Sequence, residues 1–178
     1  SEKAQFAIDQ YILGGGKMLA FLDSNHALDQ GPMGGFSPPA GSSSNLEKLL
    51  SAWGVNFTAN QVVADLGFAL RPRQTGESWP TAIDIQSDGH NENDPIMVNL
   101  GPLSGIHFGA FKRETATNEK DVPELTPLFH SSTNSALIGT VQTKGLLPLP
   151  TFQASQGDIA KSFTPTEGKN ILALKFYF

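Results

Sequence analysis

The stretch "YILGGGKMLAFLD", residues 11–23, places three glycines between two apolar segments. Upstream of the glycines, apolar residues at helical spacing predict an amphipathic helix over Glu2–Leu13. Downstream, residues 18–22 form a continuous apolar run that ends at Asp23. Such a run is typical of a strand that is covered on both faces of a parallel sheet. The predicted order of elements is therefore helix, glycines, strand.

This order decides what the glycines do. A phosphate-binding loop needs the order strand, glycines, helix, because free N–H groups at a helix N-terminus hold the anion. Here the glycines follow a helix C-terminus, where the exposed backbone groups are carbonyls. Lys17 is also followed by Met18 and not by the Ser or Thr that would bind magnesium. We therefore expect a helix cap, and no nucleotide or other cofactor.

Composition limits the classes of function. A chain of 178 residues fits a single domain, and we expect one α/β domain over residues 1–178. The net charge of −5 and the absence of a basic run argue against a nucleic-acid partner. The sequence contains no cysteine, which excludes a disulfide, a thiolate nucleophile and a cysteine-based zinc site.

A second helix–strand pair follows a segment rich in Gly, Pro and Ser. Asn45 is a favourable N-cap, and a helix over residues 45–53 is predicted to end at Gly54. Its core-facing positions at helical spacing are Leu46, Leu49, Leu50 and Trp53. Residues 62–64, before Asp65, resemble a second buried strand. The repeat predicts a parallel α/β sheet in which residues 18–22 and 62–64 are neighbouring strands.

The second half of the chain is predicted to be mostly extended. Strand-like segments occur in residues 68–86, 105–113, 125–139 and 171–178. In the last of these, apolar residues alternate along the buried face of a strand: Leu172, Leu174, Phe176 and Phe178. Because this pattern runs to the final residue, we expect the chain to be an excised part of a longer, membrane-anchored protein.

Polar residues follow both strands that are predicted in the first half. In open α/β sheets, ligands bind at the carboxyl ends of the strands. The candidate ligand-binding residues are Asp23, Ser24, Asn25, His26 and Asp65. We expect them to line one cleft.

Other sites have weaker support in the sequence. The four histidines are dispersed, so no metal site is expected. Residues 84–95 place acidic and polar residues at calcium-loop positions, but Pro95 stands where a bidentate Glu is required, which favours a solvated turn. No G-x-S-x-G motif is present. His130 and Ser131 are the remaining candidates for a serine hydrolase.

Several segments resemble one known family in order along the chain. These are "AIDQYILGGGKMLAFLD" at residues 7–23, "NLEKLLSAWGVNFTANQVVAD" at 45–65, "DPIMVNL" at 94–100, "LTPLFHSS" at 125–132 and "ILALKFYF" at 171–178. The chain resembles the GldG-like, gliding-motility-associated auxiliary proteins of an uncharacterised ABC-type transport system. It departs from that family in the long Gly/Pro/Ser-rich insert after Asp23, where relatives have a shorter loop.

The resemblance implies a flavodoxin-like α/β domain, related to class I glutamine amidotransferase-like folds. It also implies an extracytoplasmic, periplasmic position, with ABC permease and ATPase subunits as partners. The family has no accepted catalytic residues, so none is assigned here. Amidotransferase chemistry is excluded, because the nucleophilic cysteine is absent.

Three functions therefore remain open. The first is a non-enzymatic accessory domain that binds partner proteins or a cargo. The second is a binder of a small ligand, such as a carbohydrate, at the cleft near Asp23, with Trp53 and Trp79 as the indoles available for stacking. The third is a hydrolase that uses Ser131.

Overall fold

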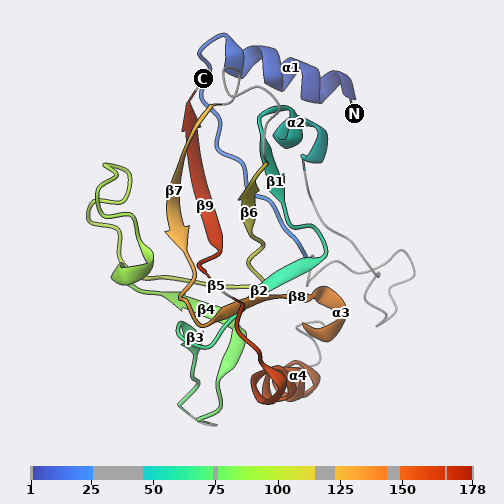
Figure 1. Ribbon diagram of the computed structural model, residues 1–178, viewed down its shortest axis with the longest axis vertical. Helices are drawn as coiled ribbons and strands as arrows, with labels where there is room; N and C mark the ends of the chain where they lie inside the picture. The colour runs from blue at the N-terminus through green and yellow to red at the C-terminus, as the bar shows by residue number, and fades with distance from the viewer. Residues whose placement is uncertain are drawn as a thin grey trace.

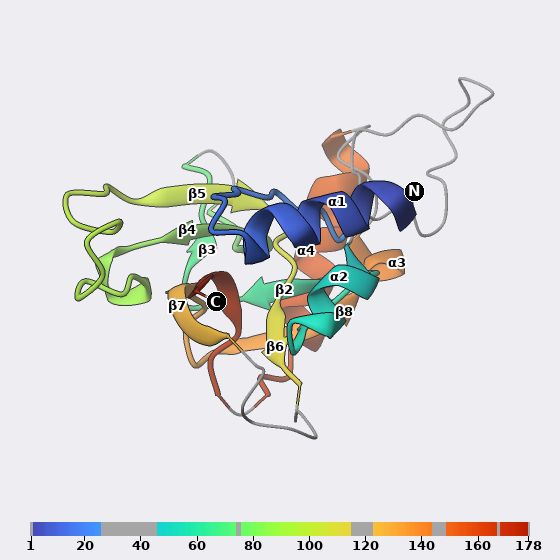
Figure 2. The ribbon, with the colours of Figure 1, turned by 90° about the horizontal axis from the view of Figure 1, so that it is seen from above.

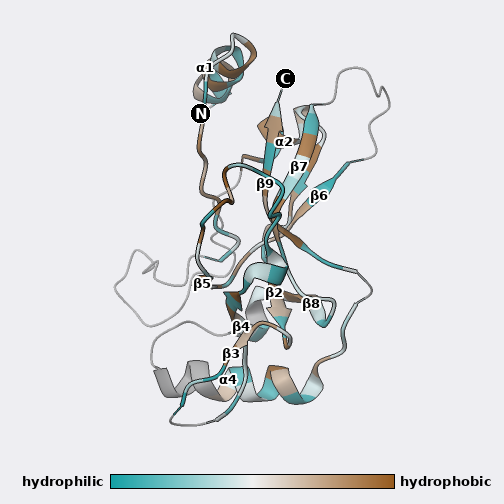
Figure 3. Cartoon of the chain, turned by 90° about the vertical axis from the view of Figure 1, so that its left-hand side faces the viewer, coloured by the Kyte–Doolittle hydropathy of each residue, from teal (hydrophilic) through white to brown (hydrophobic). Residues whose placement is uncertain are grey.

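Within the residues that the structure describes, the fold has three antiparallel sheets and four α-helices (Figure 1). The computed structural model describes residues 2–25, 46–73, 76–114, 123–143, 149–166 and 168–177. Helix α1 lies beyond one end of the largest sheet. Helix α4 lies at the opposite end of the molecule, beneath the two smaller sheets (Figures 1 and 3).

The largest sheet has four strands in the order β1-β6-β9-β7. These strands are β1 (Val55–Phe57), β6 (Phe111–Arg113), β9 (Ile171–Tyr177) and β7 (Glu124–His130). The C-terminal strand β9 is central and pairs with both β6 and β7. The prediction of a strand near the end of the chain is therefore confirmed.

The two smaller sheets lie next to the four-stranded one. One pairs β2 (Gln61–Asp65) with β8 (Ser135–Gly139). The other has the order β3-β4-β5, formed by β3 (Ala69–Leu70), β4 (Trp79–Ile85) and β5 (Leu103–Ile106). A short 3-10 helix, η1 (Ser87–Gly89), follows β4.

Two of the helices match the prediction and two do not. Helices α1 (Glu2–Leu13) and α2 (Glu47–Ala52) confirm the existence of the expected pair. The N-cap of α2 is Leu46 and its C-cap is Trp53, so the helix is shorter than predicted, and Asn45 lies outside the described residues. Helices α3 (Thr140–Thr143) and α4 (Leu149–Ser162) lie in the half predicted to be extended. The sequence of α4 gives a weak helix signal, because it contains Pro150 and Gly157. Pro150 falls in the first turn, where a helix needs no N–H donor.

The flavodoxin-like parallel sheet predicted from the sequence is wrong. Every strand pair recorded among the described residues is antiparallel, including β2 with β8. The fold is mixed α/β with antiparallel sheets and few helices. The apolar run in β2 arises because its residues 62–64 are fully buried, with β8 beside β2 in the same sheet and β4 packed against it. Such burial does not require parallel pairing.

Residues 18–22 do not form the predicted strand. They have no regular secondary structure, and the side chains of Leu19 and Phe21 are 80% and 87% exposed. Only Leu22 in this run packs against a hydrophobic cluster. Figure 2 shows the segment after α1 passing over the molecule beside β5. The apolar character of this run therefore reflects exposed surface and not a buried strand.

The core consists of two hydrophobic clusters that β9 connects. The first, centred on β4, contains Leu172 among its buried residues. The second lies beneath α1 and α2 and contains Trp53, with Leu174 and Phe176 packed against it. Because alternating residues of β9 reach both clusters, the last strand joins the two halves of the fold.

The glycines after α1 form a C-terminal cap, as predicted. The N–H of Gly16 donates to the carbonyl of Tyr11 and that of Gly15 donates to the carbonyl of Ile12, both at 2.9 Å. Gly15 has φ +87°, a left-handed conformation that suits a residue without a Cβ. The carbonyls at this helix end are therefore satisfied by the glycine backbone.

Candidate functional site

Three of the predicted ligand-binding residues lie against the turn that follows β5. The hydroxyl of Ser24 is buried and donates to the carbonyl oxygen of His107 at 3.2 Å. The N–H of Asn25 donates to Oδ1 of Asp23 at 2.9 Å, which closes a tight turn. A Cβ at Gly109 would lie 3.0 Å from Oγ of Ser24, so this glycine permits the close approach. We call Asp23, Ser24, Asn25, His107 and Thr143 the Asn25 cluster.

His107 is the buried centre of the Asn25 cluster. Its backbone is left-handed, with φ +56°, and its side chain is only 3% exposed. The amide Nδ2 of Asn25 lies 3.1 Å from Nδ1 of His107. Because an amide nitrogen can only donate, Nδ1 accepts and the imidazole is neutral, with its proton on Nε2. Burial lowers the pKa of His107 below its ordinary value of 6.5, and the charge of Asp23 opposes that shift.

The same amide group joins the cluster to helix α3. Nδ2 of Asn25 also donates to Oγ1 of Thr143 at 3.3 Å, and that hydroxyl donates to the carbonyl of Thr140 at 2.8 Å. In both of these hydrogen bonds the donor and the acceptor are fixed by the chemistry of the groups. The cluster therefore fixes the segment after α1 against β5 and α3. Asp23, Ser24 and Asn25 are among the residues singled out in the sequence. His107 and Thr143 are not, because they come from distant parts of the chain.

The network continues from His107 into α4. The N–H of His107 donates to the carbonyl of Thr81 at 2.9 Å. Oε1 of the fully buried Gln156 accepts from the N–H of Thr81 at 3.0 Å and from its hydroxyl at 2.9 Å. All of these donors and acceptors are neutral, and they hold the backbone of Thr81 between His107 and helix α4. They do not constitute an acid–base pair.

We expect the stability of the domain to fall as the pH drops from 7 to 5, in part through His107. The folded pKa lies below the unfolded one, so the unfolded chain binds the proton first as pH falls. The contribution of His107 is therefore complete above about pH 6.5 and is lost as pH falls through the interval between the two pKa values. Urea unfolding at each pH measures this effect.

The variant that tests this assignment is His107→Asn. Asparagine tolerates the left-handed backbone, so His107→Asn removes the titration without imposing a forbidden φ. We expect its unfolding free energy to change less between pH 7 and 5 than that of the wild type. Equal slopes in the two proteins would contradict the assignment.

Asp65 belongs to a separate hydrogen-bond network. It is fully buried at the end of β2, and its carboxylate accepts from the N–H groups of Gly67, Phe68 and Ser132 and from the hydroxyl of Ser132. The expected meeting of strand ends does not occur, because residues 18–22 are not a strand. No recorded hydrogen bond among the described residues joins Asp65 to the Asn25 cluster. Ligand binding by these residues stays a prediction, and His26 lies outside the described residues.

The segment compared with a calcium loop, residues 84–95, begins on a strand. Asp84 lies on β4, where Oδ1 accepts from the hydroxyl of Ser104 at 2.6 Å and Oδ2 accepts from Nε2 of Gln86 at 2.7 Å. Across the parts of the chain that the structure describes, no group of three His, Cys, Asp or Glu side chains is placed to hold a metal ion.

The residues suggested for a hydrolase are arranged for structural roles. Ser131 is fully buried, and its hydroxyl lies 2.7 Å from that of Ser135 and accepts from the N–H of Asn170 at 2.8 Å. Nδ1 of His130 donates to the carbonyl of Ser131 and not to a hydroxyl. A nucleophile needs its base within reach and an open path to the substrate. Trp53 is also buried, which removes it as a surface for sugar stacking.

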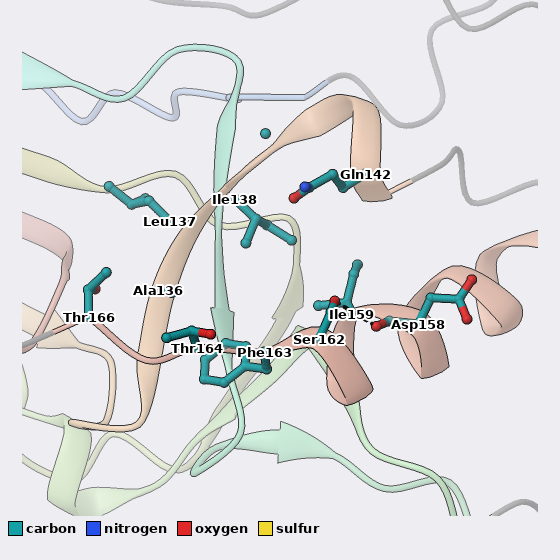
Figure 4. Close-up of a pocket in the computed structure, with 11 residues that line it drawn as sticks. Ala136, Leu137, Ile138, Gln142, Asp158, Ile159, Ser162, Phe163, Thr164 and Thr166 are labelled. Atoms are coloured by element: carbon teal, nitrogen blue, oxygen red, sulfur yellow. Dashed lines mark hydrogen bonds between the residues drawn. The ribbon is translucent and has the colours of Figure 1, made fainter.

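A pocket of about 580 Å³ lies between β8 and the C-terminal half of α4 (Figure 4). Leu137, Ile138 and Gly139 form one side of it. Asp158, Ile159 and Ser162 of α4 form the other side. The remaining lining residues are Ala136, Gln142, Phe163, Thr164 and Thr166. Sequence analysis missed this pocket because it did not predict α4. The residues of β8 carry no signal of a site, being small or aliphatic.

Comparison with known proteins identifies the family of the chain. A model of an auxiliary protein family, described as "ABC-type uncharacterized transport system", matches residues 1–173. No curated protein and no solved structure matches the chain. None of the helices in the described ranges has the length and apolar character that a membrane span requires. Since the match covers nearly the whole sequence, the chain belongs to the auxiliary protein family of the ABC-type uncharacterized transport system.

Proposed function

We propose that this chain is a non-enzymatic, extracytoplasmic accessory domain of its ABC-type transport system and that it binds partner proteins. Family membership supports the link to transport. The narrower placement in the GldG-like, gliding-motility group rests on the sequence segments at residues 7–23 and 45–65 and is part of the proposal. The periplasmic position, and the permease and ATPase subunits as partners, follow from the same resemblance.

The observation that carries partner binding is the apolar surface on α1 and on the segment that follows it. Six large apolar side chains of this region are exposed: Phe6, Tyr11, Leu13, Met18, Leu19 and Phe21. Figure 3 shows apolar residues on α1 and along the chain that descends from it. Clustered exposed apolar side chains on a folded domain mark a protein or membrane contact. We infer that the permease subunit contacts this surface.

A second candidate function is binding of a small ligand near Asp23. The buried polar groups of the Asn25 cluster favour it, because such groups fix the orientation of a ligand. Their hydrogen bonds to one another weigh against it, since a ligand would have to replace them. A ligand-dependent rise in melting temperature that is lost in Asp23→Ala would support this alternative.

Cross-linking in membranes tests the proposal. A photoreactive phenylalanine analogue at position 21 of the natural full-length protein is expected to cross-link to the permease subunit of the same system. The substitution Phe21→Glu is expected to reduce co-purification of that subunit by about tenfold or more, since a buried aromatic anchor contributes about 2 kcal/mol at an interface.

The matched control is Gln10→Glu, which adds the same charge at an exposed polar position of α1. We expect it to leave co-purification unchanged. Co-purification that is equal in Phe21→Glu and the wild type would show that this surface does not carry the contact. Absence of any subunit of the system among the cross-linked products would contradict the proposed function itself.

A further inference from the structure

Strand β8 has one free edge, and the direction of its backbone groups follows from its pairing with β2. Val63 is directly opposite Leu137 in this antiparallel pair. The N–H of Val63 donates to the carbonyl of Phe108 at 2.7 Å and so points away from β8. Residues opposite each other in an antiparallel pair either exchange both hydrogen bonds or exchange none. The N–H and C=O of Leu137 therefore point away from β2.

Other hydrogen bonds agree with this alternation. The carbonyl of Asn134 accepts from the N–H of Leu66 and the N–H of Thr140 donates to the carbonyl of Asn60, so both face β2. The carbonyl of Ser135 faces the opposite way and accepts from the N–H of Thr166 at 2.9 Å. At Ser135 the outer edge of β8 is thus already hydrogen-bonded to the segment that follows α4.

Beyond Ser135 the edge has no strand partner among the described residues. In the described part of the chain, β2 is the only strand that pairs with β8, and no recorded backbone hydrogen bond engages the outward groups of Leu137 or the N–H of Gly139. These groups border the pocket between β8 and α4. An unpaired edge that lines a pocket is a template for a further strand.

The lining of the pocket indicates what kind of strand it accepts. Ile138, Ile159 and Phe163 supply apolar surface. Asp158 is the one charged side chain among the lining residues, and the other polar ones are hydroxyls and an amide. An entering peptide with a lysine or arginine would complement that carboxylate, while an adjacent apolar side chain would cover the aliphatic residues.

We propose that the free edge of β8 binds an extended peptide segment of a partner protein, one that combines aliphatic residues with a basic residue. The peptide backbone pairs with Leu137 and Gly139, and its basic side chain pairs with Asp158. This proposal rests on the proposed function, partner binding, and assigns it a second surface, distinct from α1.

Titration of the isotope-labelled chain with a synthetic peptide that alternates valine and lysine tests the proposal by nuclear magnetic resonance. We expect the largest amide shifts at Leu137 and Gly139, and slower hydrogen exchange of these two amides in the complex. A peptide of the same sequence that is N-methylated throughout keeps the side chains but cannot donate backbone hydrogen bonds. It is expected to bind more than tenfold more weakly.

Asp158→Asn is expected to weaken peptide binding about 2- to 5-fold, as befits an exposed ion pair. The matched control is Asp88→Asn, the same chemical change at an exposed residue outside the pocket, which should leave affinity unchanged. An equal loss of peptide affinity in both variants would show that only the net charge of the chain matters, and would overturn the role of Asp158.

Three further outcomes would overturn the proposal. One is no saturable binding at millimolar peptide, and another is protection of amides outside β8. The third is slow hydrogen exchange of the Leu137 and Gly139 amides in the chain without peptide. If this protection is present at low protein concentration, another part of the same chain covers the edge. If it appears only as the protein concentration rises, a second copy of the chain covers it. None of these results affects the cross-linking from position 21, so failure here is distinguishable from failure of the proposed function.

Discussion

Replacement of Asp65 by alanine is expected to lower the free energy of unfolding by about 3–5 kcal/mol. The carboxylate is fully buried and accepts hydrogen bonds from three backbone N–H groups and one hydroxyl. Each buried donor that is left without an acceptor costs roughly 1–3 kcal/mol, and hydrogen bonds to a charged acceptor are at the upper end. The loss is large because one side chain holds both the end of β2 and the turn after β7.

Urea unfolding followed by circular dichroism measures this loss of stability. Two further variants serve as comparisons. Asp65→Asn keeps the shape but turns one acceptor into a donor, so we expect a smaller loss than for alanine. Asp88→Ala removes an exposed carboxylate and should change the unfolding free energy by less than about 0.5 kcal/mol. A loss below about 1 kcal/mol in Asp65→Ala would show that water replaces the carboxylate at little cost.

Replacement of Trp53 by alanine is expected to cost a similar amount, about 3–5 kcal/mol. Only 3% of this residue is exposed, and its ring packs against that of Phe176 with centroids 5.2 Å apart. Its indole N–H donates to Oδ1 of Asp9 at 3.0 Å, which ties α1 to the second hydrophobic cluster. Alanine therefore leaves a cavity and also releases the helix.

Hydrogen exchange distinguishes these two consequences. In Trp53→Ala we expect α1 to lose its protection at urea concentrations where β9 is still protected. Trp53→Phe keeps an aromatic ring and loses the hydrogen bond, so its cost should be about 1 kcal/mol, close to that of Asp9→Ala. Exchange of α1 that is the same in the wild type and in Trp53→Ala would show that other contacts hold the helix.

The sequence by itself determined the local elements whose signals are complete within a few residues. Helix α1 and its glycine cap follow from apolar spacing and from the need for a left-handed residue at a helix end. Helix α2, strand β2 and strand β9 follow from the same kind of local pattern. The burial of Trp53 was also predictable, because it completes the apolar stripe of α2.

Strand direction and the composition of the polar clusters were decided only by the tertiary structure. Residues 62–64 carry the same apolar signal whether the partner strand runs parallel or antiparallel, because burial depends on the layers above and below and not on direction. Residues 18–21 carry that signal too, yet they are exposed, because they lie in an irregular segment at the surface. His107 reaches Asn25 across 82 positions of the sequence, so no local pattern could join them. A short-range pattern shows which side chains are apolar, whereas long-range packing decides which of them are buried and which of them meet.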